Sequence, residues 1–287
     1  MTKLRVLDLF SGIGGFSLGL ERTGGFETVA FCEIEPFPRK VLAKHWPGVP
    51  IYEDVRTLTA DTLARDGIGV DVITGGFPCQ DISCAGKQAG IAEGTRSGLW
   101  SEIVRLVGEL RPKFIIVENV ANLLSGPSEK RGGWFGRVLG DLAECGYDAE
   151  WENIPAAAVG APHRRERVWI VAYPRQARSE QYESVEIDGG MELRNGGIDA
   201  AGFASDSRRI RLPKSRRAEA RIYSTAYAHW KANQSLYGLR WPSVAVVRGA
   251  NDGVPAKLDE PRIAALGNAV VPQIPELIGR AILEARQ

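Results

Sequence analysis

Apolar and polar residues alternate with two different periods along the first 172 residues of the chain. A short and mostly apolar run predicts a buried strand, and such runs occupy residues 4–10, 28–33, 70–76, 113–119 and 167–173. An apolar residue at every third or fourth position predicts an amphipathic helix, and this spacing occupies residues 36–46, 97–110 and 134–146. Strands that alternate with helices predict an α/β fold, a doubly wound and mostly parallel sheet with helices on both faces.

The alternating pattern stops after Pro174. From there to about residue 255 the chain is polar and rich in Gly, Arg, Ser and Asn, and periodic apolar spacing returns at residues 262–286 with a helix predicted from Pro275 onward. We therefore expect three parts: a main domain of residues 1–173, a small irregular domain of residues 174–258, and a segment of residues 259–287 that rejoins the main domain.

The composition indicates the class of protein and the cellular compartment to expect. Of the 287 residues, 44% are hydrophobic and 25% are charged, as in ordinary soluble globular proteins. No apolar run approaches the roughly 18 residues of a membrane span, and the N-terminus begins with a strand pattern instead of a secretory signal. We expect a cytoplasmic protein with no membrane partner.

Cysteine spacing bears on disulfides and metal sites, and charge distribution bears on binding partners. The four cysteines show no C-x-x-C spacing, so we expect free thiols and no metal site. The net charge of +1 says little, but residues 205–221 hold seven Lys or Arg against two Asp or Glu. Such a run is usually a solvated face, and the alternative is a surface that contacts phosphate groups.

A strand, a glycine turn and a helix follow one another in "DLFSGIGGFSLGLE", residues 8–21. In an open parallel sheet this is where a nucleotide-like ligand sits, although a structural turn is an equal alternative. Ser17 stands where the dinucleotide fingerprint needs its third glycine. Glu33 lies about 20 residues further on, where an acid binds ribose, and Asp54 could accept from an adenine amino group. Together these residues fit S-adenosyl-methionine better than NAD.

Cys79 follows a predicted buried strand and the sequence Gly-Gly-Phe-Pro. Most cysteines beside apolar runs are inert, but loops at strand exits carry the chemistry of α/β folds, and a thiolate there could act as a nucleophile. The three histidines offer no convincing Cys-His partnership. Glu118 ends the next strand at the same edge, where partial burial would raise its pKa and suit it to proton donation.

Arg165 and Arg167 begin the last predicted strand of the main domain. Because they are two residues apart, we expect them on one face of that strand. Paired arginines could orient a carbonyl group and stabilise a developing anion.

Five segments carry a resemblance. In order, "DLFSGIGGF", "GGFPCQDIS", "ENV", "RRERVWIVA" and "GNAVVPQI" closely resemble the cytosine-5 DNA methyltransferases of prokaryotic and phage type. The resemblance implies an S-adenosyl-methionine-dependent methyltransferase fold with a small target-recognition domain at residues 174–258. It also implies that the Cys79 thiolate adds to carbon 6 of a flipped cytosine, while Glu118 protonates nitrogen 3 and Arg167, supported by Arg165, holds the exocyclic oxygen.

The resemblance also implies a cofactor pocket. Phe10, Gly12 and Gly14 would line it, Glu33 would bind the ribose, and Ile34 would pack on the adenine. Further pocket or bracing residues would be Asp54, Pro78 and Asn268. The chain departs from many family members at His163, which replaces a glutamine, and at Ile34, which replaces an aromatic residue in some of them.

Expected DNA contacts lie in two segments. Residues 83–100 resemble the mobile loop of the family, with Ser83 and Arg96 near phosphates, and the basic run offers Arg208, Arg209 and Arg211. The expected partner is double-stranded DNA, bound by a monomer that acts alone or beside a restriction endonuclease on a separate chain, in restriction–modification or phage anti-restriction.

Other functions remain open. A branch of the same family methylates transfer RNA, but its Cys-Phe-Thr signature is missing, because residues 174–255 contain no cysteine. A non-catalytic DNA-binding relative would be expected to lack Cys79, Glu118 or Arg167, and all three are present. A nicotinamide-dependent dehydrogenase would leave Cys79 without a role.

Overall fold

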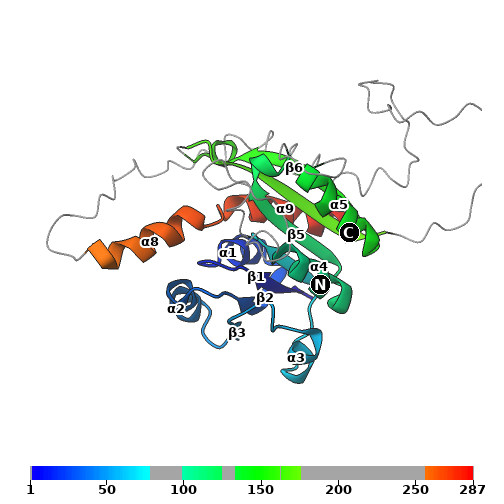
Figure 1. Cartoon of the computed structure of the whole chain (residues 1–287), viewed down its shortest axis with the longest axis horizontal. Coiled ribbons are helices and arrows are strands. Elements are labelled where there is room, and N and C mark those ends of the chain that lie inside the picture. Colours follow the sequence, from blue (N-terminus) through cyan, green and yellow to red (C-terminus); the bar gives the residue numbers. More distant parts are fainter. Residues whose placement is uncertain (1, 78–98, 125–132, 162, 176–255, 287) are drawn as a thin grey trace, which may run out of the picture.

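The computed structural model describes residues 2–77, 99–124, 133–161, 163–175 and 256–286, and these contain one seven-stranded sheet (Figure 1). Its strand order is β3-β2-β1-β4-β5-β7-β6. The strands are β1 (Leu4–Leu9), β2 (Phe26–Cys32), β3 (Ile51–Tyr52), β4 (Val72–Gly75), β5 (Phe114–Val120), β6 (Tyr147–Pro155) and β7 (Glu166–Pro174).

The sheet is mostly parallel, as predicted. Strands β1 to β5 pair in parallel, and β7 runs antiparallel between β5 and β6. The chain order reverses at β1, which pairs with β2 on one side and β4 on the other. In open sheets of this kind the ligand crevice lies at that reversal, beyond the carboxyl ends of the strands.

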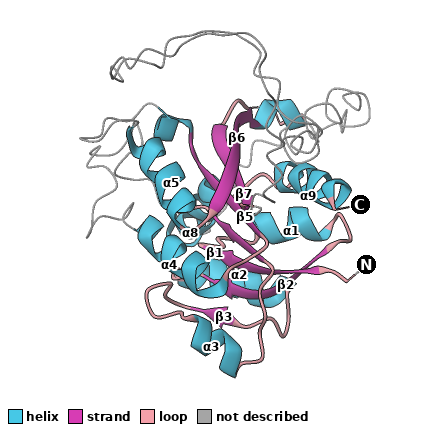
Figure 2. Cartoon of the chain, turned by 90° about the vertical axis from the view of Figure 1, so that its right-hand side faces the viewer, coloured by secondary structure: helices cyan, strands magenta, loops and turns pink. Residues whose placement is uncertain are grey.

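Helices cover both faces of the sheet, which confirms the doubly wound fold class. They are α1 (Gly15–Glu21), α2 (Pro36–His45), α3 (Ala60–Arg65), α4 (Trp100–Leu110), α5 (Gly133–Glu144), α8 (Ala256–Asn268) and α9 (Gln273–Ala285). Two short 3-10 helices are η2 (Ala121–Leu124) and η3 (Ala156–Val159). Figure 2 shows α4 and α5 on one side of the strands, and α1 and α9 on the other.

Alternating side chains of the strands fill two separate cores. In β1, Leu7 belongs to the core beneath α4 and α5, whereas Val6 belongs to the core beneath α1 and α9. This alternation is the two-residue period of a strand buried on both faces. It explains why the predicted strands are mostly apolar and do not alternate with polar residues.

The C-terminal segment packs onto the first helix. Ile274 and Ile278 of α9 share a core with Phe16 and Leu20 of α1. Gly15 and Gly19, one turn apart on α1, approach the backbone of residues 270–276 so closely that a methyl group at either would collide with a carbonyl of that segment. The "GNAVVPQI" segment is therefore seated against a glycine face of α1.

Three sequence expectations differ from the structure. Strand β6 and helices α3 and α8 were not anticipated, and the expected boundary between residues 258 and 259 falls inside α8. The helix expected from Pro275 begins at Gln273. Most of residues 174–258 lie outside the described residues, so the division into domains stays a prediction. Among the described helices, none is long and apolar enough to cross a membrane.

Candidate active site

The expected ligand crevice at the reversal point would begin with the turn that follows β1. Phe10, Gly12 and Gly14 all have positive φ angles, of 52°, 54° and 85°, and Gly14 leads directly into α1. Such angles are rare for residues other than glycine, so Phe10 is held in place by its surroundings. The N–H groups of Ser11 and Gly12 donate to Cys32 and Glu33 at the end of β2.

Glu33 joins that turn to the end of β2. One carboxylate oxygen, Oε2, accepts from the N–H of Gly12 at 2.7 Å, and Oε1 accepts from the N–H of Glu35 at 2.8 Å. The residue is buried, with 8% of its surface exposed. A carboxylate can accept about four hydrogen bonds, so Glu33 retains capacity for ribose hydroxyls. Its role toward a cofactor stays a prediction.

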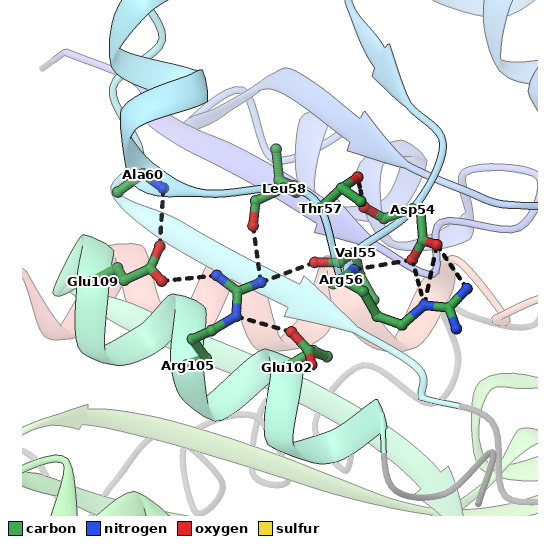
Figure 3. A network of polar contacts seen from close by, with 9 residues as sticks. All are labelled: Asp54, Val55, Arg56, Thr57, Leu58, Ala60, Glu102, Arg105 and Glu109. Atoms are coloured by element: carbon green, nitrogen blue, oxygen red, sulfur yellow. Dashed lines mark hydrogen bonds and ion pairs between the residues drawn. The ribbon is translucent and has the colours of Figure 1, made fainter. Parts of the chain in front are cut away.

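Ile34 and Asp54 lie beyond the ends of β2 and β3. Ile34 is an exposed apolar side chain, with 56% of its surface accessible. Arg56 grips the carboxylate of Asp54, with Nε 2.9 Å from Oδ1 and Nη2 2.7 Å from Oδ2 (Figure 3). This hydrogen bonding lowers the pKa of Asp54, which therefore stays an ionised acceptor. Sequence reasoning identified Asp54 and missed Arg56, two residues away.

Asp8 is a fully buried acid beneath the glycine turn, and sequence reasoning gave it no role. The hydroxyls of Ser17 and Thr74 donate to its two carboxylate oxygens at 2.8 and 2.7 Å. Burial raises the pKa of Asp8 to about 7, against the opposing effect of these hydrogen bonds. Ser17 thus does more than mark a missing glycine, because it links α1 to β1.

Glu118 and Arg167 form an ion pair across the antiparallel strands β5 and β7. Val120 lies opposite Arg167, so Glu118 is a diagonal neighbour on the same face. Arg167 Nε lies 3.1 Å from Glu118 Oε1, and 13% of the Glu118 side chain is exposed. As expected from its place at a strand end, burial raises the pKa of Glu118, and the charges of Arg167 and Arg165 act in the opposite direction.

Two contacts bring the end of β4 toward Glu118. The buried amide of Asn119 donates to the carbonyl of Phe77 at 3.4 Å. A methyl group on Gly76 would lie 3.5 Å from Glu118 Oε2, so the backbone of Gly76 borders this carboxyl group. The chain that leads to Cys79 therefore passes beside the acid at the end of β5. Asn119 belongs to the "ENV" segment, and nothing in the sequence predicts its contact with Phe77.

Arg165 corrects the expectation that two arginines share one face of a strand. Strand β7 begins at Glu166, and Arg165 precedes it with a φ of 35°, so strand alternation does not apply to it. Its guanidinium donates to the carbonyls of Gly267 at 2.6 Å and Ala269 at 3.0 Å. These carbonyls flank the exposed Asn268, so Arg165 fastens the C-terminal segment beside the ion pair.

Other candidate residues lie outside the described residues. They are Pro78, Cys79, Ser83, Arg96, Arg208, Arg209 and Arg211. Their roles stay predictions.

Comparison with known proteins identifies relatives among bacterial methyltransferases. The chain is 38% identical over 173 residues to the Type II methyltransferase M2.BsuMI of Bacillus subtilis, covering 59% of this chain and 42% of the relative. It is 38% identical over 201 residues to M.Sau3AI of Staphylococcus aureus, covering 66% and 48%. The chain thus spans less than half the length of these two relatives.

A solved structure and a family model agree with those relatives. The crystal structure of a candidate DNA modification methyltransferase encoded within an E. coli prophage superposes with a TM-score of 0.50 and 31% identity, covering 60% of this chain and 47% of that one. Residues 4–195 match the model of the C-5 cytosine-specific DNA methylases, which is well over half of the chain. The protein therefore belongs to the C-5 cytosine-specific DNA methylase family.

Proposed function

We propose that this protein transfers a methyl group from S-adenosyl-methionine to carbon 5 of a cytosine in a short site of duplex DNA. The observation that carries the proposal is the partly buried Glu118, paired with Arg167 and bordered by the strand end that leads to Cys79. This arrangement supplies an acid and a cation beside the predicted nucleophile. The cellular role would be restriction–modification or phage anti-restriction, in the cytoplasm.

The residues of the crevice fit S-adenosyl-methionine. Glu33 offers carboxylate lone pairs for ribose hydroxyls, Ile34 offers an exposed apolar surface for a base, and Asp54 offers an ionised acceptor for an amino group. When bound, the cofactor supplies an electrophilic methyl group. The protein would hold its adenosine part along the ends of β1, β2 and β3.

The protein groups would then activate the cytosine. Carbon 6 is inaccessible within a duplex, so the base must leave the stack. The thiolate of Cys79 adds to carbon 6 while protonated Glu118 gives its proton to nitrogen 3, so that no full negative charge develops on the ring. Carbon 5 takes the methyl group, a base removes the proton from carbon 5, and the thiolate leaves as nitrogen 3 returns its proton.

The electrostatics of Glu118 support this role. Burial favours its protonated form, and Arg167 stabilises the carboxylate that remains after the proton has moved. The opposing effects keep the acid able to give and to recover a proton within one turnover. Arg167 would also donate to the exocyclic oxygen of the cytosine.

The test is transfer of a labelled methyl group to duplex DNA and, in parallel, to transfer RNA, followed by base-resolution mapping. Label on DNA cytosines in one short context is the expected result and also gives the specificity. Label on RNA alone would show that the substrate is transfer RNA instead of DNA. Cofactor binding without label on either would mean that the chain is a non-catalytic relative. Sedimentation of the complex would test the expected monomer.

A further inference from the structure

Arg105 of α4 ties this helix to the loop that carries Asp54 (Figure 3). Its Nη2 donates to the carbonyl oxygens of Val55 at 2.9 Å and Leu58 at 2.8 Å. Its other nitrogens pair with two acids of the same helix, Nε with Glu102 and Nη1 with Glu109, each at 2.8 Å. One guanidinium therefore donates hydrogen bonds to four acceptors, and the two ion pairs fix its orientation.

The loop between β3 and α3 has few other restraints on its backbone carbonyls. The carbonyl of Asp54 accepts from the N–H groups of Thr57 and Leu58 at 3.1 and 3.2 Å, which closes a turn. Val55 and Leu58 bury their side chains in the core, and Arg105 binds their carbonyls. The turn is thus fixed by α4 immediately beside Asp54.

A second contact from the same helix fixes the far end of the loop. Glu109 accepts at Oε2 from the N–H of Ala60, at 2.9 Å, where α3 begins. The carboxylate of Glu102 pairs with Arg105 Nε at 2.8 Å, so Glu102 acts on the orientation of Arg105. Helix α4 therefore restrains the loop through Arg105, at Val55 and Leu58, and through Glu109 at the start of α3.

We infer that Arg105 is a positioning residue for Asp54. By holding the loop that carries Asp54, it sets the affinity for the adenine part of S-adenosyl-methionine. The inference rests on the proposed function, since it assumes that this cofactor binds along the strand ends. Arg105 itself bonds to backbone carbonyls and to acids of α4, so its effect on the ligand passes through the loop. Loss of Arg105 should raise the Kd for the cofactor and leave kcat at saturating cofactor nearly unchanged.

The test is a double-mutant cycle on cofactor binding, measured by calorimetry with the full chain. We expect R105A to raise the Kd for S-adenosyl-methionine about tenfold, which corresponds to about 1.4 kcal/mol. D54A should raise it by at least as much. The double variant should bind like D54A alone, because Arg105 acts only through Asp54. Additive effects, or an unchanged Kd in R105A, would overturn the inference.

Two further variants separate positioning from general stability. R280A is the matched control, because Arg280 makes a similar i,i+4 ion pair with Glu276, at 2.7 Å, on α9 in the opposite layer. It should bind the cofactor like the wild type. R105K keeps the positive charge, but the lysine ammonium has a single nitrogen with three donors and cannot serve all four acceptors of Arg105. This variant should therefore show the same defect as R105A. If R105A does not fold, R105K takes its place in the double-mutant cycle with D54A.

The wild-type protein separates this inference from the proposed function. If the wild type binds S-adenosyl-methionine and R105A binds it equally well, the inference alone fails. If the wild type does not bind this cofactor, the proposed function fails and the inference fails with it.

Discussion

Arg167 Nε lies 3.1 Å from Glu118 Oε1, and this pair joins the last parallel strand of the sheet to the antiparallel strand beside it. The change of strand direction places an arginine from the start of β7 beside an acid near the end of β5. A purely parallel neighbour would have brought the other end of the strand to this position. The antiparallel strand β7 therefore helps to build the site as well as the sheet.

Replacing Glu118 with glutamine should lower kcat by roughly 10²–10⁴-fold, because the amide cannot donate an acidic proton to the base. Cofactor binding should stay close to that of the wild type, since Glu118 lies at β5 and the expected cofactor contacts lie at β1, β2 and β3. Single-turnover methyl transfer with saturating DNA measures the effect. Activity within a few-fold of the wild type would remove Glu118 from the mechanism.

Replacing Cys79 with alanine should abolish methyl transfer and leave cofactor affinity nearly intact. The thiolate would be the group that bonds to carbon 6. Cys32, the free cysteine at the end of β2, is a poor substitute, because burial raises the pKa of its thiol to about 12. Transfer of label to DNA and calorimetry with the cofactor measure the two properties separately. Substantial turnover in C79A would contradict a covalent mechanism.

Replacing Arg208, Arg209 and Arg211 together with alanine should weaken DNA binding and flatten its dependence on salt. Each phosphate contact that is lost should reduce the slope of log K against log salt by about 0.9. Binding titrations at several salt concentrations measure this slope. An unchanged slope would assign the phosphate contacts to other parts of the chain.

Replacing Asp8 with asparagine should change how stability depends on pH. The folded state raises the pKa of Asp8 to about 7 from an ordinary value of 3.8, so the folded protein binds this proton more tightly than the unfolded chain. The resulting stabilisation is complete below pH 3.8 and is lost as the pH rises to about 7, by about 1.4 kcal/mol per pH unit at most. The D8N variant should lack this decline.

Urea unfolding of both proteins between pH 4 and about 8 measures the difference. Ser17 and Thr74 hydroxyls can donate or accept, so they can pair with the asparagine amide. The stability of D8N relative to the wild type should therefore improve as the pH rises. Parallel curves for the two proteins would show that Asp8 does not titrate in this window.

Two glycine-to-alanine substitutions should have opposite effects on stability. In G19A the new methyl group would meet the carbonyl of Pro272, so α9 would be pushed from α1 at a cost of about 1–3 kcal/mol. In G108A, on α4, the methyl group meets open space and should stabilise the helix by about 1 kcal/mol. Thermal unfolding measures both, and a stable G19A would contradict the close approach.

The sequence was most informative where burial is continuous. The predicted strands that became β1, β2, β4, β5 and β7 are buried on both faces, so their apolar runs predicted them to within a few residues. Strand β6 is an edge strand with exposed Glu152 and Trp151, and its mixed pattern gave no such signal. The acid at the end of β5 was predicted because a parallel strand delivers its last residues to the crevice.

Features that depend on contacts between distant segments could not be predicted. The positive φ of Arg165 has no signature in the sequence, and it removes this residue from the alternation of β7. The bonds of Arg165 to Gly267 and Ala269 join residues that lie 102 and 104 positions apart in the chain. Arg56 could have been suspected beside Asp54, but the role of Arg105 depends on the packing of α4 against a loop some 50 residues earlier.

The seating of α9 on α1 affects the order in which the protein can fold during translation. Ile274 and Ile278 of α9 cover the apolar face of α1, which includes Phe16 and Leu20. The ribosome adds these two isoleucines more than 250 residues after α1. Until then the first helix has an uncovered apolar surface, and closing so long a loop is slow. The nascent chain should therefore bind chaperones at α1, and release should follow synthesis of α9.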